Sequence, residues 1–281
     1  MHYSPKKMKN LLEDNSFNFK KKFGQNFIID ENVINRIVEN SKIDDETLVI
    51  EVGPGAGSLT AKLAIQAKQV ICYEIDTTLK AILDNVLERY HNVTVIYQDF
   101  LKSNVMNDIQ GLNYKKIYLI ANLPYYVTTP IIMKVIEEQL PVEKMVIMVQ
   151  KEVGDRFKAK PGSKDYGSLS IFLNYYYEVN KIMDISRNIF IPKPNVDSIV
   201  VEFKKRKRDY QVNDEKLFFK LIKDSFQQKR KTIRNNLKDY DLQTVENVLK
   251  KYQFDLNTRA EQIPDYVFAE ISNEIGGSYE Q

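Results

Sequence analysis

The chain has 281 residues, of which 43% are hydrophobic and 28% charged, and its formal net charge is +3. This composition is typical of a folded globular protein. No apolar run approaches the roughly 20 residues that span a bilayer, and no apolar segment follows the Lys-rich start, so we expect a cytoplasmic protein without a membrane partner. The single cysteine, Cys72, excludes an intrachain disulfide. With only His2 and His91 besides, we expect neither a metal site nor Ser-His-Asp chemistry.

Apolar runs and helical spacings alternate along the first half of the chain. The runs that predict strands cover residues 47–52, 69–73, 93–97, 117–121 and 144–149. Helical spacings lie between them at 59–65, 77–87 and 130–138. This alternation predicts an α/β fold in which helices cover both faces of a parallel sheet.

The pattern changes after residue 149. Helices are predicted at 151–157 and 167–176, followed by two extended segments, 179–185 and 198–203, that we expect to pair and close one edge of the sheet. Only helical patterns follow, at 214–227, 231–238, 241–251 and 264–274. We therefore predict an α/β domain over 1–207, with a basic N-terminal extension, and a small all-α domain over 208–281.

Charge is distributed unevenly along the sequence. Residues 204–238 contain 13 basic and 4 acidic residues, whereas 239–281 contain 3 basic and 9 acidic residues. This suits a polyanion-binding face, although a solvated linker followed by an ordinary charged helix would have the same composition. The tract 227–237 favours RNA because it mixes arginine with amide side chains, which suit phosphates and sugar hydroxyls. The predicted RNA-binding residues are Lys229, Arg230, Lys231 and Arg234.

A glycine-rich turn follows the first predicted strand. Its spacing, Gly53-x-Gly55-x-Gly57, departs from the dinucleotide-binding G-x-G-x-x-G and is not a P-loop. Glu74 ends the second strand, where a carboxylate can accept hydrogen bonds from both hydroxyls of a ribose, and Asp99 after the third strand can accept from an adenine amino group. Together they predict a nucleoside pocket. Singly, each has a structural alternative: a turn glycine, a helix N-terminal charge and a loop cap.

The run 117–121 ends at Asn122-Leu123-Pro124-Tyr125, which combines an amide, a rigid turn and an aromatic ring. An exocyclic amine such as adenine N6 is a weak nucleophile because its lone pair is delocalised. Hydrogen bonds from the amine to the Asn122 side-chain oxygen and to a backbone carbonyl of the proline turn favour its attacking geometry. Tyr125 would stack on the base. The alternative is a strand-ending turn with a half-buried tyrosine.

In this order the motifs resemble the ribosomal RNA adenine N6-dimethyltransferases, most closely their KsgA (RsmA) type. The similar stretches are 23–27 (FGQNF), 51–57 (EVGPGAG), 73–76 (YEID), 98–99 (QD), 122–125 (NLPY), 150–153 (QKEV), 190–198 (FIPKPNVDS) and 228–237 (QKRKTIRNNL). The resemblance covers nearly the whole chain. It implies a Rossmann-like class I methyltransferase sheet with helices on both faces, followed by a small all-α C-terminal domain.

The resemblance also implies a cofactor, a substrate and site residues. S-adenosylmethionine would contact Asn26, Ile28, Gly53, Glu74, Asp99 and Asn122. The catalytic residues would be Asn122, Leu123, Pro124 and Tyr125. The substrate would be two adjacent adenosines near the 3′ end of small-subunit (16S) rRNA, in an immature small ribosomal subunit bound by a monomer. Tyr125 would stack on the flipped base. Phe190 would be either a second aromatic wall or a core residue, and Tyr126 and Val127 depart from the Asn and Ile that family members often carry.

Three other functions are compatible with the sequence. The first is methylation of large-subunit (23S) rRNA by the same chemistry. The second is a non-catalytic role in ribosome assembly, against which the intact residues 122–125 argue. The third is a nicotinamide-dependent oxidoreductase, which would share the glycine turn and Glu74 but would leave residues 122–125 and the basic segment without a role.

Overall fold

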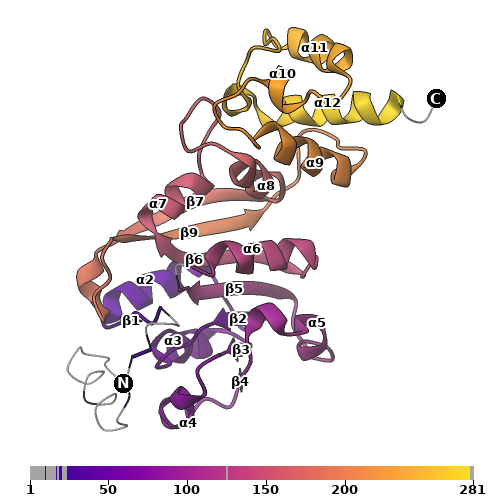
Figure 1. The fold of residues 1–281 in the computed structure, drawn as a ribbon. Helices are drawn as coiled ribbons and strands as arrows, with labels where there is room; N and C mark the ends of the chain where they lie inside the picture. The colour runs from indigo at the N-terminus through magenta and orange to yellow at the C-terminus, as the bar shows by residue number, and fades with distance from the viewer. Residues whose placement is uncertain (1–9, 11–16, 18, 21–23, 125, 279–281) are drawn as a thin grey trace. The chain divides into compact units, whose positions relative to one another are not determined.

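The computed structural model describes residues 10, 17, 19, 20, 24–124 and 126–278. The chain divides into two compact units (Figure 1). The first, the sheet unit, comprises the residues up to Gly154 together with Asn180–Lys205. The second, the helical unit, comprises Asp155–Val179 and the residues from Arg206 onward. The sequence predicted one boundary, between 207 and 208, whereas this division also groups Asp155–Val179 with the C-terminal helices.

One large sheet organises the described part of the chain. In spatial order its strands are β4 (Val93–Ile96), β3 (Gln69–Tyr73), β2 (Thr47–Val52), β5 (Lys116–Asn122), β6 (Val142–Gln150), β9 (Ser198–Lys205) and β7 (Tyr177–Ile185). The strands from β4 to β6 pair in parallel, and β9 runs antiparallel to β6. The predicted parallel sheet is therefore confirmed, as is the pair of later strands that closes one edge.

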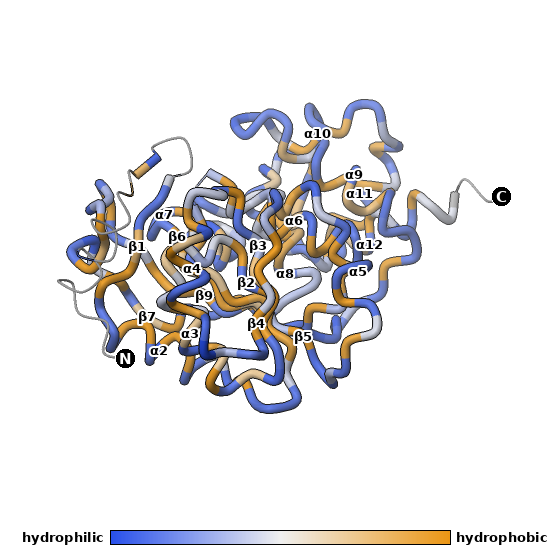
Figure 2. Tube along the Cα trace, turned by 90° about the horizontal axis from the view of Figure 1, so that it is seen from below, coloured by the Kyte–Doolittle hydropathy of each residue, from blue (hydrophilic) through white to orange (hydrophobic). Residues whose placement is uncertain are grey.

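The central strands are buried because helices cover both faces of the sheet. Every residue of β2 is buried, and Figure 2 shows hydrophobic colour along β2 and β5. The helices of this unit are α2 (Glu31–Ser41), α3 (Ser58–Gln66), α4 (Lys80–Leu87), α5 (Val105–Asp108), α6 (Thr128–Glu137) and most of α7 (Lys151–Phe157). The sequence reading found all of them except α2 and the single turn of α5.

Helix α2 has a clear signal that the sequence reading missed. The Asp30 side chain accepts hydrogen bonds from the backbone N–H groups of Asn32 and Val33, so it caps the helix. Ile34, Ile37 and Val38 follow at helical spacing and are buried. A second small sheet pairs β1 (Phe27–Ile28) antiparallel with β8 (Phe190–Ile191). It joins a segment near the start of the chain to one far along it.

The helical unit has its own apolar core. Its helices are α8 (Ser168–Tyr176), α9 (Glu215–Ser225), α10 (Ile233–Asn236), α11 (Leu242–Lys251) and α12 (Asp265–Ser278). Their buried side chains form one cluster that includes Phe218, Leu249 and Phe268. The helices predicted after residue 208 are confirmed, α10 being shorter than predicted. Within the described residues, no helix is long and apolar enough to cross a membrane.

Candidate functional site

A cleft lies at the edge of the sheet where the parallel strands β2 to β5 end. It encloses about 1080 Å³, including space open to solvent. Eight of the predicted site residues line it: Asn26, Ile28, Gly53, Glu74, Asp99, Asn122, Leu123 and Pro124. The carboxyl ends of parallel strands meet at one edge of a sheet, so residues separated by many positions in sequence come together here.

The glycine turn between β2 and α3 requires glycine at its centre. Gly53 and Gly55 have φ angles of +71° and +58°, a region that other residues rarely adopt. A Cβ atom on Gly55 would also lie 2.9 Å from the ring of Phe27. A Cβ on Gly53 would meet nothing within 4 Å, so the backbone of Gly53 faces open space beside the cleft. A ligand can therefore approach the main chain at this point.

Glu74, after β3, presents a buried carboxylate to the cleft. It is 4% exposed, and its oxygens accept the N–H groups of Gly55 at 3.2 Å and Asp76 at 2.8 Å. Burial raises the pKa of Glu74 to about 7, although these backbone hydrogen bonds act in the opposite direction. A buried acceptor with few donors of its own suits a ligand that brings hydroxyl groups.

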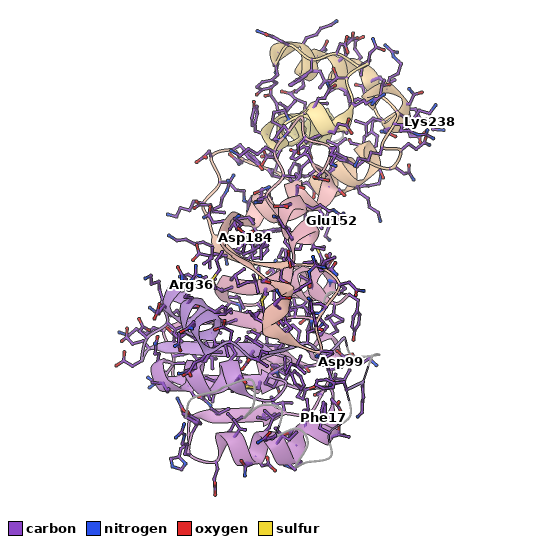
Figure 3. All side chains as sticks on the ribbon, turned by 90° about the vertical axis from the view of Figure 1, so that its left-hand side faces the viewer. Phe17, Arg36, Asp99, Glu152, Asp184 and Lys238 are labelled. Carbon is purple, nitrogen blue, oxygen red and sulfur yellow. The ribbon has the colours of Figure 1, made fainter. Side chains whose placement is uncertain are left out.

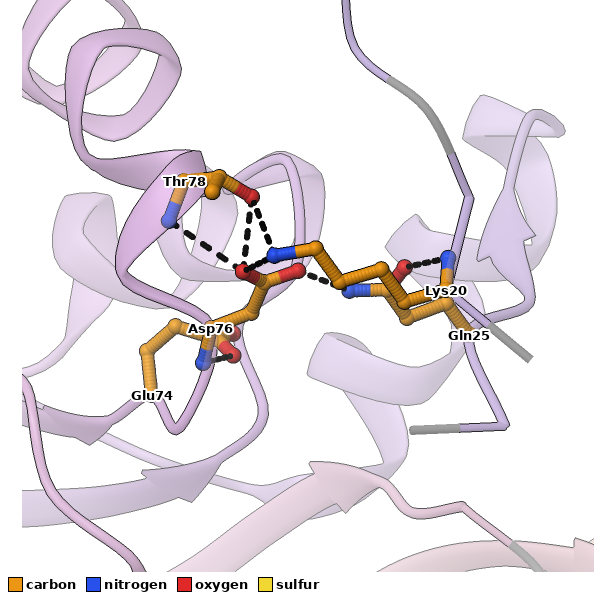
Figure 4. A network of polar contacts seen from close by, with 5 residues as sticks. All are labelled: Lys20, Gln25, Glu74, Asp76 and Thr78. Carbon is orange, nitrogen blue, oxygen red and sulfur yellow. Dashed lines mark hydrogen bonds and ion pairs between the residues drawn. The ribbon is translucent and has the colours of Figure 1, made fainter. Parts of the chain in front are cut away.

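Asp76, two residues after Glu74, binds Lys20 and Gln25 from the N-terminal part of the chain. No role was predicted for Asp76 from the sequence. Its side chain accepts hydrogen bonds from Lys20 Nζ at 2.6 Å and Gln25 Nε2 at 2.8 Å (Figure 4). Burial alone would raise the pKa of Asp76, but hydrogen bonds from Lys20, Thr78 and Gln25 outweigh it and lower the pKa below its ordinary value. The residue therefore carries a negative charge at neutral pH.

Asp99, labelled in Figure 3, lies after β4. It is partly buried. Its Oδ1 accepts the backbone N–H of Leu101 at 3.0 Å, which caps the short helix Phe100–Lys102. The loop-cap role considered from the sequence is thus present. Because Asp99 also lines the cleft and its carboxylate has a second oxygen, capping leaves acceptor capacity for a ligand.

Asn122 is the last residue of β5, and its amide is oriented by the N-terminal segment. Its Nδ2 donates to the backbone oxygen of Asn26 at 2.9 Å. A carbonyl can only accept, so this contact fixes which end of the amide is nitrogen and turns Oδ1 the other way. In the turn that follows, the Pro124 carbonyl accepts the N–H of Val127 at 3.1 Å and the hydroxyl of Thr128 at 3.4 Å. Tyr125 lies outside the described residues.

Phe190, the second residue predicted to contact the base, is buried in the core. It is 3% exposed, lies in the core cluster of the sheet unit and pairs with Ile28 across the small sheet. It is absent from the described residues that line the cleft. The structure therefore agrees with the core alternative, and a stacking role would require the ring to leave the core.

The predicted RNA-binding residues belong to the helical unit. Lys229, Arg230 and Lys231 lie between α9 and α10, Arg234 lies in α10, and all of them are exposed. Lys229 Nζ donates to the backbone oxygen of Lys164 at 2.7 Å. Within the described residues, no group of His, Cys, Asp and Glu is arranged to hold a metal ion.

Comparison with known proteins identifies relatives along nearly the whole chain. The family model described as ribosomal RNA adenine dimethylase matches residues 16–276. The "Ribosomal RNA small subunit methyltransferase A" of Bacillus cytotoxicus is 47% identical over 281 residues, covering 97% of this chain and 96% of the relative. The protein of the same name from Bacillus cereus is 45% identical over 282 residues, with the same coverage.

Two solved structures share the fold. A dimethyladenosine transferase from Plasmodium falciparum has a TM-score of 0.75 at 24% identity, covering 90% of this chain and 98% of that one. The 23S rRNA methyltransferase ErmE has a TM-score of 0.70 at 23% identity, covering 89% and 99%. These support a class I methyltransferase fold, and the sequence relatives are much closer. Because the family model spans most of the chain and the Bacillus relatives are nearly half identical to it, this protein belongs to the ribosomal RNA adenine dimethylase family.

Proposed function

We propose that this protein transfers methyl groups from S-adenosylmethionine to the N6 amines of two adjacent adenosines near the 3′ end of small-subunit (16S) rRNA, in the cytoplasm during small-subunit assembly. The observation that carries the proposal is the convergence of Asn122, Glu74 and Gly53 on one cleft, in a chain nearly half identical to small-subunit rRNA methyltransferases. The sheet unit would hold the chemistry, and the helical unit would bind RNA.

The residues of the cleft fit the cofactor. Glu74 is buried and offers carboxylate oxygens, as a ribose with two hydroxyl donors requires. The open space beside Gly53 admits a ligand close to the backbone. Asp99 would accept from the adenine amino group, and the segment from Asn26 to Ile28 would close the other side of the site. When bound, S-adenosylmethionine supplies an electrophilic methyl group on a sulfonium sulfur.

The protein's own part in the reaction is to position and polarise the target amine. Asn122 Oδ1, turned away from Asn26, would accept one N–H of adenine N6. The Pro124 carbonyl already accepts two hydrogen bonds within its turn, so the Leu123 carbonyl is the better second acceptor. Two acceptors draw the nitrogen towards a tetrahedral geometry and align its lone pair for in-line attack. Tyr125 would hold the base by stacking. The proton released after transfer passes to water.

The proposal is tested by methyl transfer from labelled S-adenosylmethionine to small-subunit particles that lack the modification. Naked rRNA and large-subunit particles serve as parallel substrates, followed by nucleoside analysis. We expect dimethyladenosine in the small-subunit particles alone. Label only in large-subunit RNA would move the substrate to 23S rRNA, and cofactor binding without transfer to any substrate would favour a non-catalytic assembly role.

A further inference from the structure

Asp76 is almost completely buried, yet it is not among the residues that line the cleft. Its side chain is 1% exposed and accepts from Lys20 Nζ at 2.6 Å, Gln25 Nε2 at 2.8 Å, the Thr78 hydroxyl at 2.6 Å and the Thr78 backbone N–H at 3.2 Å (Figure 4). Burying a carboxylate costs several kcal/mol unless donors replace water. The contacts from Thr78 cap the short helix that follows, so the hydrogen bonds from Lys20 and Gln25 to the Asp76 carboxylate require a different explanation.

The donors fall into two groups with different consequences. Thr78 lies two residues away and makes the contacts that begin the short helix Thr77–Leu79. Lys20 and Gln25 lie 56 and 51 residues earlier in the chain, so their contacts fix a distant segment to the end of β3. The backbone N–H of Lys20 also donates to Gln25 Oε1 at 3.0 Å. We call Asp76, Lys20 and Gln25 the Asp76 clasp.

The clasp ends one residue before the carbonyl that orients Asn122. Gln25 is followed by Asn26, whose backbone oxygen accepts Asn122 Nδ2 at 2.9 Å. The segment also lies close against the turn after β5. Gly24 has a φ of +58°, and a Cβ there would be 3.3 Å from the Tyr126 ring and 3.4 Å from Pro124 Cβ. A shift of this segment would therefore move the acceptor that holds the Asn122 amide.

Asp76 also contacts the other polar group of the site through its main chain. Its N–H donates to Glu74 Oε1 at 2.8 Å, and Glu74 Oε2 accepts the N–H of Gly55 at 3.2 Å. The same residue is thus joined to the carboxylate proposed to bind the ribose and, through the N-terminal segment, to the amide proposed to bind the target amine.

We propose that Asp76 is a positioning residue: through Lys20 and Gln25 it holds the Asn26 carbonyl in place and so orients the Asn122 amide for methyl transfer. This inference rests on the proposed function of Asn122. It assigns to Asp76 and Lys20, which do not line the cleft, and to Gln25 at its edge, a contribution to the rate of methyl transfer that acts through Asn122.

A double-mutant cycle tests this dependence. Lys20→Met combined with Gln25→Met removes both long-range donors, leaves the Thr78 cap in place and retains aliphatic side chains of similar length. The rate of a single turnover is measured at saturating S-adenosylmethionine and small-subunit particles, in the parent chain and in an Asn122→Ala background. We expect a loss of about tenfold or more in the parent, because small misplacements of reacting groups have large effects on rate. In the Asn122→Ala background we expect a loss below about twofold, because the group that the clasp positions is gone.

The matched control is Lys116→Met. It removes an ion pair of the same length, 2.6 Å to Asp44, at the opposite end of the strand that carries Asn122. The control should leave the rate within about twofold. Equal fold losses from the clasp substitutions in both backgrounds, or a control loss as large as theirs, would overturn the positioning role.

A second measurement does not depend on activity. The side-chain amide of Asn122, observed by nitrogen-15 NMR, should shift or broaden in the clasp variant and not in Lys116→Met. An unchanged amide signal would overturn the inference even if activity fell. If the parent chain methylated no RNA, the proposed function would fail, while this signal would still decide whether the clasp orients Asn122.

Discussion

Two acidic groups of the sheet unit and three basic groups of the tract 227–237 are held in opposite ways. Glu74 and Asp76 are at most 4% exposed, and each accepts hydrogen bonds from defined donors. Arg230, Lys231 and Arg234 are exposed, and none of them takes part in the ion pairs described for the helical unit. The acidic groups are fixed in position before any ligand arrives, and the basic groups are left available for one.

The fixed acidic groups suit methyl transfer, and the exposed basic groups suit the binding of a polyanion. A methyl-transfer site gains from preorganised polar groups, because reorienting them during the reaction would raise the barrier. A surface that meets a long polyanion gains from mobile, solvated charges that release counterions on binding. Substitutions in the cleft should therefore change rates or cofactor affinity, and substitutions in the basic tract should change RNA affinity and its salt dependence.

Removing the Asn122 amide should give the largest effect. Asn122→Ala deletes the proposed acceptor for adenine N6, and we expect the single-turnover rate to fall by about 10²-fold, in line with the loss of one preorganised polar group in other enzymes. Affinity for S-adenosylmethionine, measured by calorimetry, should change by less than about threefold. Equal losses in rate and cofactor affinity would contradict the role assigned to Asn122.

The tight packing of the sheet unit can be probed at Gly154 in α7. A Cβ there would lie 2.3 Å from Cδ1 and 2.7 Å from Cγ1 of Ile199, which is fully buried in β9. We expect Gly154→Ala to lower the free energy of unfolding by about 1–3 kcal/mol, because the core must shift to admit the methyl group. Thermal and urea unfolding measure the change.

The control for this substitution lies in the helical unit. A Cβ on Gly277, in α12, meets nothing within 4 Å, so Gly277→Ala should leave stability unchanged or raise it by up to about 1 kcal/mol. If the two substitutions had the same effect, the close approach of α7 to β9 would not constrain residue 154.

The raised pKa of Glu74 predicts that cofactor binding depends on pH. Without ligand, burial raises the pKa of Glu74 to about 7, so the carboxyl is mostly protonated at pH 6. An ionised carboxylate can accept from both ribose hydroxyls, so affinity for S-adenosylmethionine should rise as the pH increases from 6 to 8, by up to about tenfold. The stability of the unliganded protein should depend on pH in the opposite direction from the cofactor affinity. Because the pKa of Glu74 is higher in the folded than in the unfolded chain, the contribution of this group to the free energy of unfolding falls as the pH rises through 7.

A second buried acid provides the control. Burial also raises the pKa of Glu51 to about 7, and the charge of Glu74 contributes to that rise. Calorimetry at pH 6, 7 and 8 should show a nearly flat affinity for Glu74→Gln and a retained increase for Glu51→Gln. The opposite pattern would transfer the titration to Glu51 and remove the ribose assignment from Glu74.

The sequence predicted the parts of this molecule that depend on local patterns. The apolar runs 47–52 and 69–73 match β2 and β3 residue for residue, because a strand buried on both faces has a continuous apolar signal with clear ends. The meeting of Gly53, Glu74, Asp99 and Asn122 followed from the predicted strands β2 to β5, since parallel strands end at a common edge.

The contacts that orient the site could not be predicted in this way. The bond from Asn122 to Asn26 joins residues 96 positions apart, and those of the Asp76 clasp span more than 50. No period in the sequence encodes such meetings, since they depend on how the N-terminal segment packs. Phe190 shows the same limit, because an aromatic residue before a Pro-rich turn suits a ligand wall or a core equally well, and only its burial separates the two.

The smallest effect per residue should come from the basic tract. We expect the combined change Arg230→Gln, Lys231→Gln and Arg234→Gln to weaken binding to small-subunit particles several-fold, and to lower the slope of log affinity against log salt by up to about 2, since each lost phosphate contact on single-stranded RNA removes roughly 0.7. Fluorescence anisotropy or filter binding at several salt concentrations measures both quantities.

Lys250→Gln is the matched control, an exposed lysine of the same unit that is already paired with Glu246 at 3.2 Å. The single-turnover rate at saturating particles should stay within about twofold of the parent, because these side chains are proposed to hold RNA and not to touch the reacting amine. A large fall in that rate with an unchanged salt slope would place the tract in the chemistry and abolish the division of work between the two units.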